Sequence, residues 1–138
     1  MIAKTNLLKG RKKTSHAFAY IKDNDGIDTE ASYPYEASDE KCRYTNRTRG
    51  ANEIGKIDLR EGDEKQLQIA VARIGPVSVG IDASSNLTGY SKGIYSSNFC
   101  SQTKLDHGVL VVGYGTEMMR SINGTKKQID YWIVKNRY

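Results

Sequence analysis

Long apolar runs are absent from this sequence of 138 residues. Hydrophobic residues make up 38% of it, and its mean hydropathy is −0.61. No run approaches the roughly 20 apolar residues that a membrane-spanning helix needs, so we predict no membrane span. Residues 1–8 are mixed in character and are followed by charge, so we expect no signal peptide in this chain. A chain this short and polar has room for one domain with a modest core, or it is part of something larger.

Cysteine is also scarce, with Cys42 and Cys100 alone in the sequence. Structural zinc sites usually take about four Cys or His ligands at short spacings, and these two cysteines are too few and too far apart for one. We therefore predict no metal site, and no other residue pattern indicates a cofactor. The two thiols could form one disulfide with each other, or each could have lost its partner.

Charge is unbalanced toward the basic side. The net charge is +5 at pH 7, and much of it lies in the cluster Lys9–Lys13. A nucleic-acid-binding surface needs a basic face combined with aromatic residues or a known module, and neither follows this cluster. We interpret the cluster as a solvated basic segment and expect no nucleic-acid partner.

Three Asn-X-Ser/Thr tripeptides begin at Asn46, Asn86 and Asn123. This tripeptide is the acceptor for N-glycosylation in the secretory pathway, and it is also common by chance. Three copies in so short a chain favour a secretory-pathway ancestry, and each Asn is a candidate glycosylation site.

The pattern of apolar and turn-forming residues predicts a mixed α and β fold. Residues 1–13 show no periodicity and are expected to be disordered. In the first part of the chain we expect a helix from residue 14 that ends in the turn residues 23–26, an ordered loop over 26–35, a further loop over 36–52 and a short strand over 54–59. A second helix is then capped by Asp63, stopped by Gly75 and Pro76, and carries the apolar stripe Leu67, Ala70, Val71 and Ile74. After it we expect a strand over 77–82, a loop that carries Cys100, a central strand from Gly108, a polar exposed hairpin over 116–128 and a last strand over 129–136. This order is typical of the α+β class with a mostly antiparallel sheet.

The central strand is preceded by a histidine, His107. The four consecutive aliphatic residues Val109–Val112 predict a strand that is buried on both faces. A histidine at the start of such a strand is held by a rigid element and can still face a cleft. By itself this position is a weak signal, because histidines at strand ends are more often structural than catalytic.

Four stretches of the sequence form a series: Ala17–Lys22 with Ser32–Glu36, Ile74–Ala83, Asp106–Gly115, and Tyr131–Asn136. In order and spacing they resemble the papain family of cysteine peptidases, closest to its cathepsin L branch. The resemblance covers nearly everything from residue 17 to 136. It implies a papain-like α+β fold, mostly the antiparallel β-barrel-like right half with a remnant of the helical left half. Residues 1–56 are then the remnant, and residues 57–138 are the β-barrel-like half.

By this resemblance, His107 and Asn136 are catalytic residues. In the family a thiolate attacks a peptide carbonyl, and a neighbouring histidine stabilises the thiolate and then protonates the leaving amine. His107 matches that histidine, and Asn136 matches the asparagine whose carbonyl binds the other ring nitrogen. In a period-two strand, Asn136 shares a face with Trp132 and Val134. The alternative is that both residues are inherited from an ancestor without a catalytic role and only pack against neighbours or face solvent.

Four further positions resemble the family's substrate-side wall: Leu105, Asp106, Gly108 and Gly80. The resemblance implies protein or peptide substrates, and a propeptide or cystatin-type inhibitors as further partners. It also implies a lysosomal or extracellular location.

The family's nucleophilic cysteine has no counterpart in these residues. The family carries it in a Gln-x-x-x-Cys-Gly-Ser-Cys-Trp stretch near the mature N-terminus, whereas no glutamine precedes Gln66 here. Cys42 and Cys100 match half-cystines whose partners would lie in missing upstream and downstream segments. The similarity also stops abruptly, at residues 10–14 and again after Asn136.

These departures predict a fragment of a cathepsin L-like cysteine endopeptidase, inactive alone because it lacks its thiol. The alternative is a non-catalytic peptidase homologue that binds peptides or inhibitors.

Overall fold

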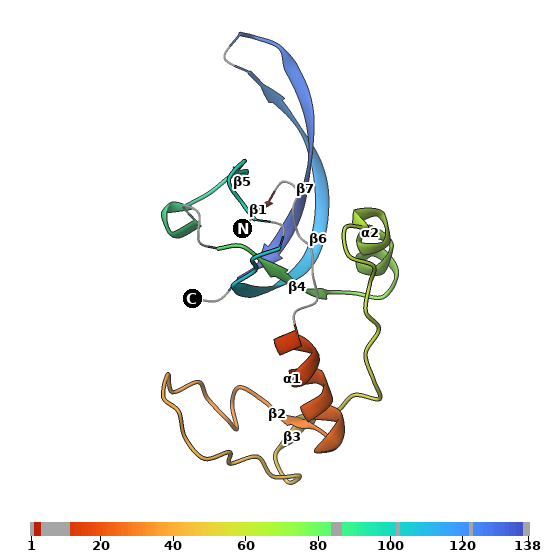
Figure 1. Cartoon of the computed structure of the whole chain (residues 1–138), viewed down its shortest axis with the longest axis vertical. Helices are drawn as coiled ribbons and strands as arrows, with labels where there is room; N and C mark the ends of the chain where they lie inside the picture. Colours follow the sequence, from red (N-terminus) through yellow and green to blue (C-terminus); the bar gives the residue numbers. More distant parts are fainter. Residues whose placement is uncertain (1, 4–11, 84–86, 102, 122, 137–138) are drawn as a thin grey trace. The chain divides into compact units, whose positions relative to one another are not determined.

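The structure is a computed structural model that describes residues 2–3, 12–83, 87–101, 103–121 and 123–136 (Figure 1). The chain divides into two compact units, one made of Lys12–Asp58 and the other of Met1–Arg11 with Leu59–Tyr138. The change of unit lies two residues beyond the expected boundary at 56/57. That the units correspond to the two halves of a papain-like fold stays a prediction. No helix among the described residues is long and apolar enough to cross a membrane.

In the unit Lys12–Asp58, the helix α1 spans Lys12–Asp23. Its C-terminal end is closed by backbone hydrogen bonds, with the Gly26 N–H donating to the Ile21 carbonyl at 2.8 Å. Gly26 has a positive φ of 147°, and a Cβ there would collide with the side chain of Arg49. The predicted helix and its turn at 23–26 are confirmed, because turn chemistry is local.

The expectation of disorder over residues 1–13 is wrong at both ends of that range. Ile2–Ala3 form the strand β1, and α1 begins at Lys12 instead of residue 14. The rest of the range, residues 1 and 4–11, lies outside the described residues. A two-residue strand carries no periodicity, so its position is set by the strands beside it and not by its own sequence.

The segment expected to be loop over 26–52 contains a small antiparallel sheet. Its strands are β2, Ile27–Asp28, and β3, Arg49–Ala51. In the connection between them the Arg43 guanidinium binds Glu36 at 2.6 Å and lies 4.9 Å above the ring of Tyr33. The Tyr33 hydroxyl accepts the backbone N–H of Arg43 at 3.3 Å. This loop is therefore ordered by its aromatic and charged side chains.

The strand expected over residues 54–59 does not form. Ile54 is 96% exposed and Ile57 is 88% exposed. A strand needs a partner for its backbone groups, and in the described part of this unit only β2 and β3 pair. The apolar residues Ile54 and Ile57 therefore wrongly indicated a strand.

The second unit contains the helix α2, Glu64–Arg73, as predicted. The Asp63 carboxylate accepts the Gln66 N–H at 2.8 Å and so caps the first turn. Leu67 and Ala70 of this helix are buried. Ile74 departs from the expected stripe, because it is the C-cap residue and its side chain is 85% exposed.

A five-stranded sheet forms the body of this unit, in the order β4-β6-β7-β1-β5. The neighbours are antiparallel except β1 and β5, which are parallel. Its remaining strands are β4, Val77–Ile81; β5, Ile94–Tyr95; β6, His107–Arg120; and β7, Lys126–Lys135, with a 3-10 turn η1 at Leu87–Gly89. The α+β class with a mostly antiparallel sheet is confirmed. The polar exposed hairpin predicted over 116–128 is confirmed, because β6 and β7 pair through this segment and its described residues are exposed (Figure 1).

The predicted burial of the central strand on both faces is wrong, because Val109 and Val111 are buried while Leu110 between them is half-buried and Val112 is exposed. Val111 pairs with Val134, and the next pair is Gly113 with Ile133, so Val112 is an extra residue in β6. Val111 is fully buried, whereas Val112 is 40% exposed. A β-bulge leaves one residue without an opposite partner and turns the strand locally. The run of four aliphatic residues concealed this irregularity.

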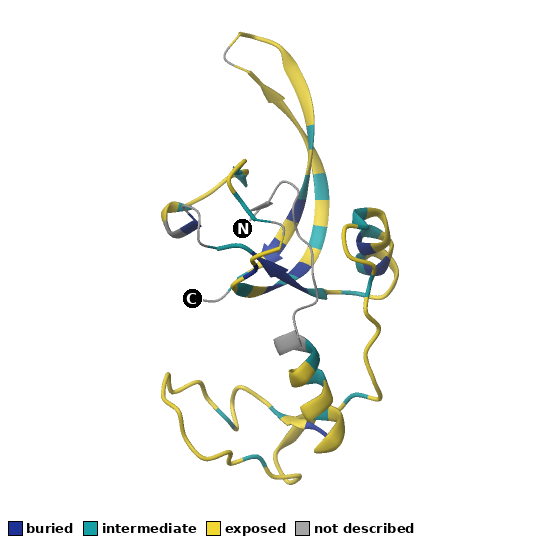
Figure 2. Cartoon of the chain, in the orientation of Figure 1, coloured by how far each residue is buried: buried dark blue, intermediate teal, exposed yellow. Residues whose placement is uncertain are grey.

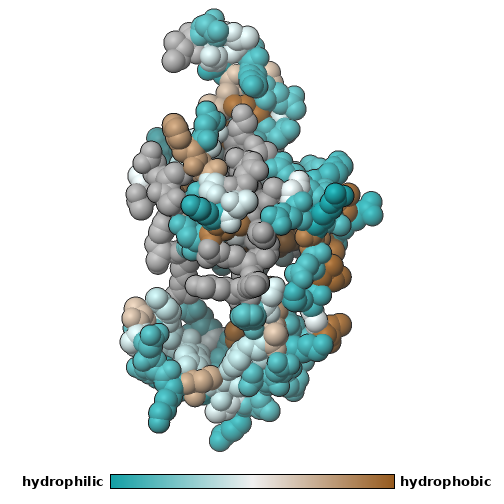
Figure 3. Space-filling model, viewed as in Figure 1, coloured by the Kyte–Doolittle hydropathy of each residue, from teal (hydrophilic) through white to brown (hydrophobic). Residues whose placement is uncertain are grey.

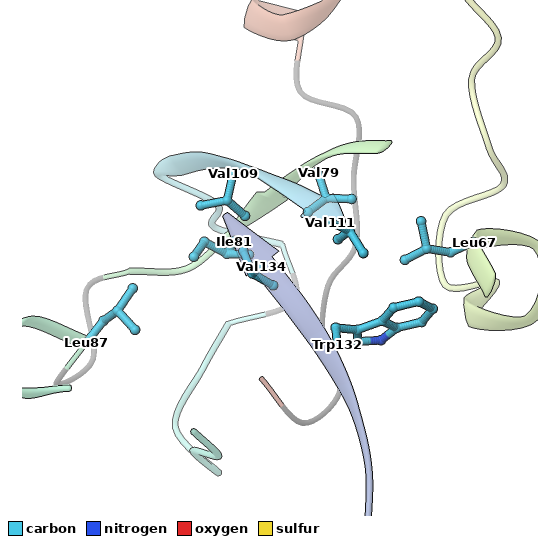
Figure 4. Packing of buried hydrophobic residues seen from close by; sticks show 8 residues of the cluster. All are labelled: Leu67, Val79, Ile81, Leu87, Val109, Val111, Trp132 and Val134. Atoms are coloured by element: carbon cyan, nitrogen blue, oxygen red, sulfur yellow. The ribbon is translucent and has the colours of Figure 1, made fainter. Parts of the chain in front are cut away.

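The core of the unit is a single apolar cluster between the sheet and its neighbours (Figures 2 and 4). The buried residues come from α2, η1, β4, β6 and β7: Leu67, Val79, Ile81, Leu87, Val109, Val111, Trp132 and Val134. Figure 2 shows burial concentrated where β4 joins β6 and β7, with the outer half of the hairpin exposed. The buried part of the sheet therefore includes the start of β6 and the end of β7.

Candidate active site

His107 is the first residue of β6, and the chain is fixed on both sides of it. In the antiparallel register Ile81 of β4 lies opposite His107. The preceding Asp106 donates its N–H to the Ile81 carbonyl at 3.1 Å and accepts the Ala83 N–H on its carboxylate at 2.7 Å. Leu105, at 1% exposure, anchors the same segment in the apolar interior. The imidazole is therefore presented from a backbone with little freedom to move.

Asn136 directly follows β7, and its side chain reaches back to His107. The Asn136 Oδ1 lies 2.7 Å from His107 Nε2, and the contact is partly buried. A carbonyl oxygen can only accept, so the proton of this bond belongs to Nε2. The second ring nitrogen, Nδ1, is then the one available to another group. A hydrogen bond thus joins two residues that lie 29 positions apart in the sequence.

The surroundings of Asn136 restrict water on one side. Val134 and Trp132, two and four residues earlier on the same strand face, are both buried. The Trp132 ring packs edge-on against Tyr114, with centroids 5.9 Å apart and planes at 75°. A hydrogen bond near such an apolar face is stronger than one in bulk water. The β7 strand therefore holds Asn136 at the edge of the core.

The four residues predicted to form the substrate-side wall lie in different surroundings. Gly80 and Gly108 lie opposite each other across β4 and β6. Gly108 is exposed, and no atom lies within 4 Å of where its Cβ would be, so open space adjoins the strand there. The side chain of Leu105 is in the interior and that of Asp106 is bonded to Ala83, so both brace the backbone. A role of these residues in substrate binding stays a prediction.

The bracing role of Asp106 was not visible in the sequence. Its partner Ala83 is 23 positions away and is recognised only by a backbone N–H, which every residue type but proline carries. No side-chain signal could have identified this contact.

The two cysteines lie in different units of the described chain, and no disulfide joins them. The Cys42 Sγ lies 3.1 Å from the Tyr20 hydroxyl. That hydroxyl, helped by the Tyr44 backbone N–H, lowers the pKa of the Cys42 thiol. The same contact raises the pKa of Tyr20 to about 12. The structure therefore does not contain the disulfide between Cys42 and Cys100 that the sequence left open as one alternative.

A surface hollow of about 250 Å³ lies between α2 and the β6–β7 hairpin. Its walls include Glu64 and Gln68 of α2 and Asp130 of β7, and neither His107 nor Asn136 lines it. Burial beside this hollow raises the pKa of Glu64. Among the residues that the structure describes, no three His, Cys, Asp or Glu side chains gather to hold a metal ion.

Comparison with known proteins places this geometry in a family. The pattern described as "Papain family cysteine protease" matches residues 10–138. The chain belongs to the papain family of cysteine proteases. It is 51% identical over 124 residues to cathepsin L of Sarcophaga peregrina, which covers 89% of this chain and 34% of that protein. Procathepsin L of Rattus norvegicus is 51% identical, covering 88% of this chain and 35% of the relative.

Solved structures agree with the sequence relatives. Digestive procathepsin L 3 from the larval midgut of Tenebrio molitor matches with a TM-score of 0.77 and 45% identity, over 89% of this chain and 37% of the other. The resemblance to the cathepsin L branch and the papain-like fold are both confirmed. The chain spans about a third of the length of these relatives.

Proposed function

We propose that residues 1–138 supply the histidine–asparagine pair of a cathepsin L-like cysteine endopeptidase, which hydrolyses peptide bonds in proteins. The observation that carries the proposal is the 2.7 Å bond between His107 Nε2 and Asn136 Oδ1, on a chain about 50% identical to cathepsins L. Family membership alone would not distinguish a working pair from two inherited residues. A bonded pair held by two adjoining strands has the arrangement that catalysis needs.

In the proposed reaction, His107 works through its Nδ1 side while Asn136 holds the ring. A thiol gives its proton to Nδ1, and the resulting imidazolium stabilises the thiolate that attacks the substrate carbonyl. The same proton then passes to the amine that leaves. Holding Nε2–H on Asn136 keeps the imidazole in the tautomer and orientation that both transfers require.

The thiol in this proposal comes from a cysteine outside residues 1–138. Cys42 and Cys100 match half-cystines of the family and not its nucleophile, and the Cys42 thiol is hydrogen-bonded to the Tyr20 hydroxyl. Protein or peptide substrates are proposed for the complete site, with a propeptide or cystatin-type inhibitors as further partners. The relatives' names, which include procathepsins, support a propeptide. A lysosomal or extracellular location is proposed on the same ground.

A graft tests the proposal directly. The 124 aligned residues replace their counterparts in cathepsin L of Sarcophaga peregrina, which supplies the remaining two-thirds of the protein. We expect E-64-sensitive hydrolysis of a fluorogenic peptide by the graft, abolished by His107→Ala. The 138-residue chain assayed alone is expected to show none.

Two results would overturn this proposal. One is a graft that folds with its thiol accessible to iodoacetamide yet neither reacts with E-64 nor cleaves peptide, because its thiol would then lack a working histidine. The other is E-64-sensitive turnover by the 138-residue chain alone. Saturable peptide binding by a folded but inactive graft would favour the non-catalytic alternative.

A further inference from the structure

We propose that Asn123 is an N-glycosylation site, chosen over the other two acceptor tripeptides by the turn in which it lies. Asn123-Gly124-Thr125 forms part of the reversal between β6 and β7, at the far end of the hairpin. Figure 1 shows this end of the hairpin extending beyond β1, β4 and β5, and Figure 3 shows mainly hydrophilic residues there. All three residues of the tripeptide are exposed.

The turn holds the Asn123 side chain in one orientation. Its Oδ1 accepts the Thr125 hydroxyl at 2.7 Å and the Thr125 backbone N–H at 3.3 Å. A backbone N–H can only donate, so the atom that faces Thr125 is the amide oxygen and not the nitrogen. The amide nitrogen Nδ2 is therefore not the atom that contacts Thr125, and the residue that carries it is exposed. Because the side chain is already ordered, a transferase loses less entropy in binding it.

The backbone of the turn supports this orientation. The Gly124 N–H donates to the Ser121 carbonyl at 2.9 Å, and the Ser121 N–H donates to the Thr125 carbonyl at 2.8 Å. Gly124 has a positive φ of 82°, a conformation that L-residues other than Asn and Asp rarely adopt. The glycine between Asn and Thr is thus part of the geometry and not a neutral spacer.

The tripeptide at Asn46 differs in the same bonds. There the Thr48 hydroxyl donates to the Thr45 carbonyl at 3.1 Å and lies 3.1 Å from the Thr45 hydroxyl. The threonine is therefore engaged with the residue before the asparagine. Asn86 lies outside the described residues. Of the two acceptors that can be compared, only Asn123 has its threonine bonded to its own side chain.

The modification itself is a glycosyl transfer from a polyprenyl-diphosphate-linked oligosaccharide. Asn123 Nδ2 bonds to the anomeric carbon of the first sugar while the bond from that carbon to the diphosphate oxygen breaks. The amide gives up one proton, and polyprenyl diphosphate leaves. No electrons are exchanged with another reactant. The tripeptide is the sequence that this class of transferase recognises.

The test is translation of the full chain, behind a cleavable signal sequence, into endoplasmic-reticulum microsomes. An Asn-Gly-Thr tag on a flexible linker after residue 138 reports that the chain reached the lumen. Glycosidase-sensitive mass shifts and peptide mapping then measure the occupancy of each site. We expect Asn123→Gln and Thr125→Ala to lose a shift that Thr125→Ser and Asn46→Gln retain.

A matched pair at Gly124 separates the turn from the tripeptide itself. Gly124→Ala and Gly124→Asn both keep the acceptor sequence, but only Asn tolerates the positive φ at low cost. We expect occupancy at Asn123 to fall roughly fivefold in the alanine variant and to stay unchanged in the asparagine variant. A chain with a glycosylated tag but an unmodified Asn123 overturns the proposal. Equal occupancy in both Gly124 variants, or a site at Asn46 filled ahead of Asn123, overturns the role of the turn.

Discussion

Replacing Asn136 by alanine probes the bond on which the proposed active site rests. The substitution removes the acceptor that lies 2.7 Å from His107 Nε2 and leaves the ring held by its backbone alone. A hydrogen bond to a charged group contributes about 1.5–3 kcal/mol, and the imidazole carries charge while it stabilises a thiolate. At about 1.4 kcal/mol for each tenfold change in rate, kcat/KM of the grafted enzyme should fall roughly 10- to 150-fold.

The loss should lie in kcat, because Asn136 acts through His107 and is not expected to touch the substrate. Fluorogenic peptide hydrolysis, normalised to active sites titrated with E-64, measures kcat and KM separately. Imidazole ¹⁵N spectra of the same variant should show that the ring no longer favours the Nε2–H tautomer. Asn136→Asp keeps an acceptor and should retain both more activity and the tautomer.

Asn98→Ala, at an exposed position between β5 and β6, is the matched control and should leave kcat/KM unchanged. An Asn136→Ala graft within threefold of the unsubstituted graft would refute the reasoning. So would a loss confined to KM, because it would place Asn136 in substrate binding instead of ring positioning.

Three further predictions concern the folding of the chain and the Cys42 thiol. Val111→Ala removes two methyl groups from a fully buried position and should lower the free energy of unfolding by about 2–3 kcal/mol in urea titration, whereas Val112→Ala should change it by less than about 0.5 kcal/mol. Asp63→Ala removes a helix cap and should cost about 1 kcal/mol by the same assay, with Asp63→Asn close to neutral. Tyr20→Phe removes the donor that lowers the pKa of Cys42, so the pH profile of iodoacetamide alkylation should move to higher pH while that of the other cysteine stays fixed. A profile that does not move would show that the Tyr20 hydroxyl does not stabilise the thiolate.

The features that the sequence predicted correctly depend on neighbouring residues. The helix α2 was predicted with its cap because Asp63 and the stripe at Leu67 and Ala70 all lie within about three turns. The end of α1 followed from the turn residues after it. Such signals need only the geometry of one helix, which is the same in every fold.

The features that the sequence missed depend on distant partners. The strands β2 and β3 have two and three residues, and each exists only because the other lies beside it. The apolar residues Ile54 and Ile57 gave a signal for a strand, but no described partner lies beside them. At the candidate site, the pair His107 and Asn136 came from resemblance to a family. Neither the 2.7 Å bond nor the bracing of Asp106 could be read from spacing alone.

The bulge at Val112 reconciles two requirements of the sheet that a regular hairpin could not meet. On β7, the alternation that buries Trp132 and Val134 also brings Asn136 to the face of His107. On β6, Val111 opposes Val134, yet Tyr114 opposes Trp132, so three positions on β6 span two on β7. The extra residue turns Tyr114 to the same side as Trp132, where their rings meet. Without it, the aromatic contact and the valine pairing would need opposite registers, and a slip by one residue would turn side chains to the other face. One extra residue, five positions from His107, therefore lets the valine pairing beside the histidine–asparagine pair coexist with the aromatic contact farther along the hairpin.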